Sequence, residues 1–281
     1  MLVNGKKMLQ EAKANHYAIP ACNYIDSDSA RAFLKVAEKE NRPLILAYAQ
    51  KHQGILSLEE AASIGNYFAK KATVPVVLHL DHGEDIDFIA KAIQLGFNSV
   101  MIDASSESFE ENIRLTREVV ALSHAFDIPV EAELGHVGAN DLVKDLGHTG
   151  SIYTAPESVT VFIAQTKVDS LAVSIGTAHG LYKRSPHISF EALSQICQVT
   201  DLPLVLHGGS SSGDENLKRC AEGGIAKINI YTDFVDAAFQ ALKEWPAFKD
   251  WIEVKKKGQS AMEAVLSHYY AVFGTPKYPR R

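Results

Sequence analysis

The sequence predicts an α/β protein, a single-domain (β/α)₈ barrel of the TIM type over residues 1–281. Short β-rich apolar runs recur eight times at fairly even intervals, and helical segments lie between them. Most runs are continuously apolar, as expected of parallel strands that are covered on both faces. The chain has 281 residues, 46% of them hydrophobic, and no linker or low-complexity tract divides it. This composition suits one large core.

The expected strands are six to eight residues long, which is an ordinary strand length. They are residues 18–24, 44–49, 76–82, 99–105, 129–135, 170–176, 202–209 and 226–232. Eightfold alternation of strand and helix indicates a closed barrel rather than an open sheet.

Three of the intervening helices have recognisable N-terminal signals. Ser57 with Glu60, and Ser108 with Glu111, have the spacing of a capping box. Pro156 suits the first turn of a helix, because its missing N–H costs nothing there.

Two connections, residues 136–155 and 177–188, are too long to be simple turns. Both are rich in Gly and polar residues, so we expect lids or binding loops there.

The bulk composition excludes several classes of protein. With a net charge of −6, the chain is not expected to attract nucleic acid or an anionic membrane. Three widely spaced cysteines, Cys22, Cys197 and Cys220, form neither a disulfide framework nor a CxxC metal clamp. The N-terminal residues lack the apolar core of a signal peptide, and no apolar run is long enough to span a membrane. We therefore expect a cytoplasmic protein.

Chemically able residues collect where the expected strands end, which is the active-site end of this fold. They are Asp81, His82, Asp103, Glu131, Glu133, His179, His207, Asn229, Thr232 and Asp233. Three histidines at three strand ends suit Zn²⁺, with a fourth position left for water or substrate. Asp103 and Glu133 are candidate oxygen ligands of the metal or hydrogen-bond partners of the histidines. The alternative interpretation is that these two residues cap helices or form salt bridges at the rim of the barrel. His79 is expected to pack inside the barrel.

A Gly/Ser-rich run, Gly208 to Gly213, precedes a helix expected from about Glu215. Glycine lets backbone N–H groups approach an anion, and a helix N-terminus adds a favourable dipole. Phosphate commonly binds at loops seven and eight of this barrel, so the run is a candidate phosphate site rather than a plain turn.

Six segments resemble the class II fructose- and tagatose-bisphosphate aldolases. They are VPVVLHLDHG (74–83), VMIDAS (100–105), VEAELG (130–135), DSLAVSIGTAHGLYK (169–183), LPLVLHGGS (202–210) and AKINIYTD (226–233). The resemblance implies that His82, His179 and His207 hold a catalytic Zn²⁺. It also implies that Glu133 binds the metal in an alternative position and that Asp103 lies near it.

The resemblance further implies roles in substrate handling. Asp81 matches the acid/base for the hydroxyl proton at the bond that breaks, and Asp141 is the candidate second base. The residues matching substrate, phosphate or monovalent-cation (Na⁺ or K⁺) contacts are Asn23, Gly180, Lys183, Gly208, Gly209, Ser210, Asn229 and Thr232. The expected reaction is reversible cleavage of a ketose phosphate to dihydroxyacetone phosphate and an aldehyde, by a homodimer or homotetramer.

Four departures from the family pattern keep the substrate open. Cys22 replaces an aromatic residue, Ala49 replaces a Ser or Thr, Tyr231 replaces an acidic, amide or small residue, and GGSSSGDE (208–215) differs from the usual loop. Fructose and tagatose 1,6-bisphosphate are the leading substrates. Another ketose 1-phosphate with an unphosphorylated aldehyde partner is the alternative.

Three other classes compete with a metal-dependent aldolase. A Schiff-base aldolase needs a buried strand lysine, but 170–176 has none, and Lys227 opens its strand and is expected at the wrong end. The common barrel hydrolases need a His-x-His pair in the first strand, and 18–24 has no histidine. A non-catalytic sugar-phosphate-binding subunit would not need both the histidines and Asp81.

Overall fold

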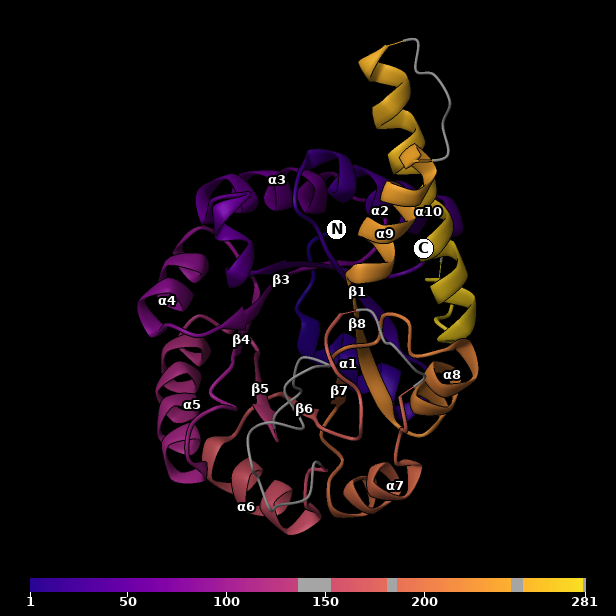
Figure 1. Cartoon of the computed structure of the whole chain (residues 1–281). Coiled ribbons are helices and arrows are strands. Elements are labelled where there is room, and N and C mark those ends of the chain that lie inside the picture. Colours follow the sequence, from indigo (N-terminus) through magenta and orange to yellow (C-terminus); the bar gives the residue numbers. More distant parts are fainter. Residues whose placement is uncertain (136–152, 181–185, 244–249, 280–281) are drawn as a thin grey trace.

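The computed structural model describes residues 1–135, 153–180, 186–243 and 250–279. Its eight strands form one closed parallel barrel in the sequential order β1 to β8, which confirms the expected fold (Figure 1). The strands are β1 (Ile19–Asn23), β2 (Leu44–Ala49), β3 (Val76–Gly83), β4 (Ser99–Ile102), β5 (Val130–Leu134), β6 (Ser170–Val173), β7 (Leu204–Leu206) and β8 (Ile225–Ile230). Several end a few residues earlier than the sequence predicts.

Apart from α1, the helices surround the barrel (Figure 1). The helices are α1 (Gly5–Ala14), α2 (Ser27–Glu40), α3 (Leu58–Lys71), α4 (Ile86–Gln94), α5 (Phe109–His124), α6 (Pro156–Thr166), α7 (Phe190–Val199), α8 (Asp214–Glu222), α9 (Thr232–Lys243) and α10 (Trp251–Val272), with a 3₁₀ turn η1 (Gln50–Gly54) after β2. α1 packs against β8, and its Leu9 and Ala12 form a buried cluster with Ile19 and Ala226 of the barrel, so α1 closes the N-terminal end of the barrel. None of the helices in the described ranges is both long and apolar enough to cross a membrane.

The predicted helix starts are largely as expected. Ser57 and Glu60 form a reciprocal capping box at α3, and Pro156 is the first residue of α6. Ser108 caps α5 by accepting from the Glu111 amide, but the Glu111 carboxylate pairs with Arg114 instead of completing the box. α8 begins at Asp214, one residue before the expected start.

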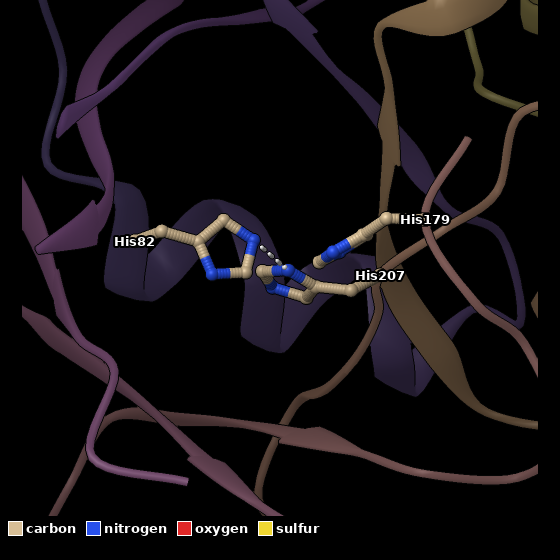
Figure 2. Close-up of side chains that lie close together, drawn as sticks. All are labelled: His82, His179 and His207. Carbon is tan, nitrogen blue, oxygen red and sulfur yellow. Dashed lines mark hydrogen bonds between the residues drawn. The ribbon is translucent and has the colours of Figure 1, made fainter. Parts of the chain in front are cut away.

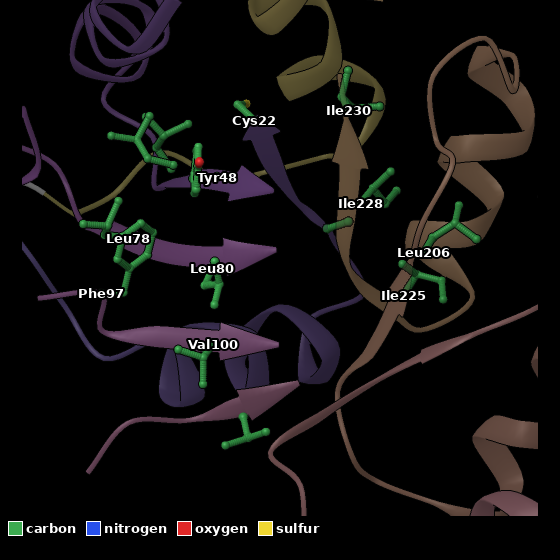
Figure 3. Close-up of a cluster of buried hydrophobic side chains, with 14 of the residues drawn as sticks. Cys22, Tyr48, Leu78, Leu80, Phe97, Val100, Leu206, Ile225, Ile228 and Ile230 are labelled. Carbon is green, nitrogen blue, oxygen red and sulfur yellow. The ribbon is translucent and has the colours of Figure 1, made fainter. Parts of the chain in front are cut away.

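Residues along each strand alternate between two environments. Leu78, Leu80 and Val100 belong to the main apolar cluster between the sheet and the helices (Figure 3). His79 and Asp81, one position along from these, are also buried and contact groups of other strands inside the barrel. The strands are therefore buried on both faces, and only the inner face is polar. This period-2 division places the chemistry in the barrel interior.

Candidate active site

Three histidines converge at the C-terminal end of the barrel (Figure 2). His82 comes from β3, His207 directly follows β7, and His179 lies in the connection after β6. The ligand atoms of all three lie within 4.8 Å of one another, and His82 Nε2 is 2.8 Å from His207 Nδ1. The sequence predicts this convergence, and the structure brings the three side chains together.

A backbone distortion allows Asp81 and His82 to face the same cavity. Adjacent strand residues normally point to opposite faces. β3 continues through both residues, but its pairing with β4 shifts register between Leu80 and Gly83, and His82 has a φ of +47°. A left-handed conformation at a non-glycine residue costs about 1–3 kcal/mol and is commonly found at functional sites. β3 therefore bends at His82, whereas the sequence predicted that the strand ends at this residue.

Carboxylates determine which ring nitrogen of His82 and of His207 faces the centre of the cluster. His82 Nδ1 lies 2.7 Å from Asp103 Oδ2, and His207 Nε2 lies 2.9 Å from Glu131 Oε1. Each contact leaves the other nitrogen, His82 Nε2 and His207 Nδ1, directed at the centre of the cluster. Hydrogen-bonded carboxylates hold metal-ligating histidines in this way.

The electrostatics of the cluster suit a divalent cation. Four acidic side chains (Asp81, Asp103, Glu131 and Glu133) surround the histidines, whereas Lys227 is the one fully buried lysine within the described ranges. Burial lowers the pKa of His82, but Asp81, Asp103 and Glu133 outweigh it and raise that pKa to about 9. Burial and the neighbouring histidines lower the pKa of His179 to about 3. Three nitrogen donors amid excess negative charge fit Zn²⁺, with Glu133 near enough to His82 to be a further ligand.

Asp81 is held by two amide side chains. Asn23 Nδ2 donates to its Oδ2 and Asn229 Nδ2 donates to its Oδ1, each at 2.8 Å. Burial opposes ionisation, but His82, His207 and Lys227 keep the pKa of Asp81 well below its usual value. Asp81 is therefore an oriented carboxylate that can accept a proton. Asn229 Oδ1 is buried and accepts no hydrogen bond from any described residue, so a ligand hydroxyl can bind there.

These groups open onto a cavity of about 310 Å³. It is lined by Asn23, Lys51, His52, Asp81, His82, His179, Gly180, Gly208, Ser210, Asn229, Tyr231 and Thr232. The predicted site residues Asp103, Glu133, His207 and Gly209 do not line it. Asp103 lies behind His82, in contact with its Nδ1, whereas Glu133 Oε2 lies 3.9 Å from His207 Nδ1. The Gly209 amide donates to the Asn229 carbonyl at 3.2 Å. Asp141 and Lys183 lie outside the described residues.

The Gly-rich side of the cavity is built for close backbone approach. Gly208 has a φ of +66°, and a Cβ there would lie 2.4 Å from the Ala178 carbonyl oxygen. Gly180 has a φ of +93°, with open space where its Cβ would lie. Ser210 Oγ accepts from the amides of Tyr231 (3.2 Å) and Asp233 (3.3 Å), so it caps the start of α9. Thr232 is the first residue of α9 and not, as expected, the end of the strand.

A buried ionic layer lies beneath the histidines, and its central residue, Lys227, is not at the end of the barrel where the sequence predicted it. Lys227 lies inside the barrel, where its Nζ donates to both oxygens of Glu131 at 2.9 and 2.8 Å and contacts His79 Nε2 at 3.2 Å. The register places Lys227 beside Val205 and Ile19, in the middle of the barrel and not at its far end. Its engagement with Glu131, and its absence from the cavity lining, still argue against a Schiff-base role.

We predict that Lys227→Met lowers the free energy of unfolding by about 3–5 kcal/mol, because it leaves the Glu131 carboxylate buried without its ion-pair partner. Lys227→Met combined with Glu131→Gln should recover much of this loss, since the uncompensated charge is gone. Chemical denaturation of the chelated proteins measures both. Equal stability of Lys227→Met and the unmodified protein would contradict a structural role for this ion pair.

The chain is similar to known proteins over almost its whole length. The family model described as class II fructose-bisphosphate aldolase matches residues 3–277. Among solved structures, the YdjI aldolase from Escherichia coli K12 is 36% identical, with 98% of each chain covered and a TM-score of 0.88. A putative fructose-1,6-bisphosphate aldolase from Coccidioides immitis is 29% identical, with 95% of each chain covered and a TM-score of 0.86. The fructose-bisphosphate aldolase from Campylobacter jejuni is 26% identical, with 99% of this chain and 97% of that chain covered and a TM-score of 0.83.

Proposed function

The chain belongs to the class II fructose-bisphosphate aldolase family, and from this premise we propose that it is a zinc-dependent aldolase that reversibly cleaves a ketose phosphate to dihydroxyacetone phosphate and an aldehyde. The observation that carries the proposal is a cluster of three imidazoles, two of which (His82 and His179) line the same cavity as an oriented Asp81 carboxylate. His82, His179 and His207 would hold the zinc. When bound, zinc supplies Lewis-acid stabilisation of the negative charge that develops on the ketose oxygens.

Asp81 removes the proton from the C4 hydroxyl group as the C3–C4 bond breaks. The aldehyde then leaves, and the electron pair of that bond stays on the dihydroxyacetone phosphate half, which takes up a proton at C3 from the protonated form of a second base. Asp141 is the candidate for that base. Asn23 and Asn229 orient Asp81 through their amide groups, and Asn229 Oδ1 offers an acceptor to a substrate hydroxyl.

The Gly-rich side of the cavity is the proposed site of the C1 phosphate. Gly180, Gly208 and the start of α9 at Thr232 face the cavity there, and a helix N-terminus favours an anion. Gly209 and Ser210 would support the loop, because the first pairs with Asn229 and the second caps α9. Lys183 and a bound Na⁺ or K⁺ are further expected contributors, and a homodimer or homotetramer stays a prediction.

Substrate cleavage before and after chelation tests the proposal. The panel comprises fructose 1,6-bisphosphate, tagatose 1,6-bisphosphate and ketose 1-phosphates with no second phosphate, and the readout is release of dihydroxyacetone phosphate. We expect chelation to abolish release and added zinc to restore it, since the three histidines supply the proposed metal site. The fastest substrate identifies the specificity.

No release from any panel member by zinc-loaded protein would refute the proposal. Ester or amide hydrolysis without aldol cleavage would favour a hydrolase instead. Borohydride trapping of substrate on the chain would favour a Schiff-base mechanism.

A further inference from the structure

The loop after β7 contains a serine in a backbone conformation that favours glycine. Ser211 has a φ of +59°, in the left-handed region, where an L side chain is strained and glycine is not. It directly follows Ser210, which lines the cavity at the proposed phosphate site. The loop is also one of the four departures from the family pattern. Contacts from outside the loop are therefore needed to hold Ser211 in this conformation.

Asp233, in the first turn of α9, supplies those contacts. Its carboxylate accepts from the Ser211 amide at 2.9 Å and from the Ser211 hydroxyl group at 2.8 Å. In the opposite direction, the Asp233 amide donates to Ser210 Oγ at 3.3 Å. Asp233 directly follows Thr232, which lines the cavity at the start of α9. These reciprocal bonds join the two segments of the proposed phosphate site, immediately behind the residues that face the cavity.

A tyrosine of α10 holds the Asp233 carboxylate in turn. α10 packs beside α8 and α9 on one side of the barrel (Figure 1), and the Tyr269 hydroxyl group donates to Asp233 Oδ2, the oxygen that also accepts from the Ser211 amide. Tyr269 is 6% exposed, and its ring stacks on Phe273 at 5.1 Å between centroids. Burial, and then the bond to Asp233, raise the pKa of Tyr269 above its usual value, so the hydroxyl group keeps its proton and acts as the donor.

Tyr269 does not line the cavity, so it can affect a ligand there only through Asp233. A hydrogen bond to a carboxylate is stronger than one between neutral groups, and it fixes the direction of the acceptor. Without the Tyr269 donor, the Asp233 carboxylate is free to rotate away from Ser211, and the strained loop loses the contacts that oppose its relaxation.

We propose that Tyr269 is a positioning residue for the phosphate group of the substrate. Through Asp233 it holds Ser211 in the left-handed conformation and so keeps residues 208–213 fixed against the start of α9. This inference rests on the proposed function, because the phosphate site that it supports is the one assigned there.

Titration calorimetry with inorganic phosphate and steady-state kinetics test the inference on the zinc-loaded chain. For Tyr269→Phe, which keeps the ring but removes the donor, we expect the Kd for inorganic phosphate and the KM for the fastest substrate of the panel to rise about fivefold, as for one hydrogen bond that acts indirectly. The zinc content should not change, and kcat should stay within about twofold, since the lost interaction contributes to binding and not to the chemical step.

A second substitution tests whether the effect passes through Ser211. Glycine adopts the left-handed conformation without support from Asp233. Ser211→Gly combined with Tyr269→Phe should therefore return the Kd for inorganic phosphate and the KM to within about twofold of the unmodified protein.

Tyr270→Phe is the matched control, because Tyr270 is the next residue of α10 and is fully buried. Its hydroxyl group donates at 2.9 Å to the carbonyl of Pro43, which precedes β2 at the opposite end of the barrel. Tyr270→Phe removes a buried hydrogen bond of the same kind, so a merely structural effect would appear in both variants. We expect it to lower stability without changing the Kd for inorganic phosphate or the KM.

Three results would overturn the inference and leave the aldolase function intact: unchanged Kd and KM in Tyr269→Phe, an equal rise in Tyr270→Phe, or a double variant no better than Tyr269→Phe. Failure of the aldolase function would appear separately, as no release of dihydroxyacetone phosphate by the zinc-loaded unmodified protein. The Kd for inorganic phosphate would then still decide whether Tyr269 positions an anion-binding loop.

Discussion

Replacement of His207 by Ala is expected to abolish zinc binding and aldol cleavage together. His207 is fully buried at the centre of the cluster, with Nδ1 2.8 Å from His82 Nε2 and Nε2 held by Glu131. Ala leaves two imidazoles, and catalytic zinc sites generally use three protein ligands. Zinc content should fall from about one ion per chain to below about a tenth after dialysis against a weak chelator, and kcat/KM should fall by about a thousandfold or more.

Elemental analysis and the dihydroxyacetone phosphate assay measure the two effects on the same sample. His268→Ala is the matched control, because His268 lies on α10 with an exposed side chain bonded to Asp214, away from the cavity. It should keep both zinc and activity. Full zinc occupancy in His207→Ala would remove His207 from the ligand set, and loss of activity with zinc retained would assign it another role.

The positions of the three histidines could be predicted because strand order and strand ends determine them. All eight strands are parallel, so residues at their C-terminal ends must meet at one mouth. His82, His179 and His207 each follow or end a recognisable apolar run, and Asp81 directly precedes His82. Counting strands was therefore sufficient to collect these residues at one end of the barrel.

Other parts of the site depend on geometry that a linear pattern does not contain. The shift of register in β3 and the left-handed φ of His82 allow both Asp81 and His82 to face the cavity. No residue type in the segment LDHG (80–83) predicts either of these backbone features. Lys227 meets Glu131 because the stagger of β8 in the barrel places it opposite β5. Because Lys227 is the second residue of the expected strand 226–232, the sequence predicted it at the N-terminal end of the barrel.

The burial of His52 is a further feature that depends on packing between distant parts of the chain. His52 belongs to a short polar segment, where a histidine is usually exposed at the surface. The structure buries His52, because its ring packs on Tyr231, which lies 179 positions later in the chain and directly follows β8. The position of His52 three residues after the run 44–49 was the available signal, since that is the cavity end of the strand.

Asp81→Asn is expected to keep zinc and lose turnover, which separates proton transfer from metal binding. The side chain keeps its size, but it no longer carries the charge that accepts the C4 hydroxyl proton. Loss of a general base typically costs about 10²–10⁴ in rate. We expect kcat to fall within that range with little change in KM, because Asp81 is not among the proposed zinc or phosphate contacts.

Asp103→Asn is the contrasting variant, because Asp103 contacts His82 Nδ1 at 2.7 Å and does not line the cavity. It should weaken zinc binding by about 10–100-fold, and added zinc should restore much of its turnover. Zinc competition titrations and steady-state kinetics on both variants therefore give opposite patterns if the two aspartates have different roles. Near-normal kcat in zinc-loaded Asp81→Asn would rule out Asp81 as the acid/base. Restoration of its turnover by excess zinc would instead make Asp81 a residue that orders the metal site, because a missing proton acceptor cannot be replaced by more metal.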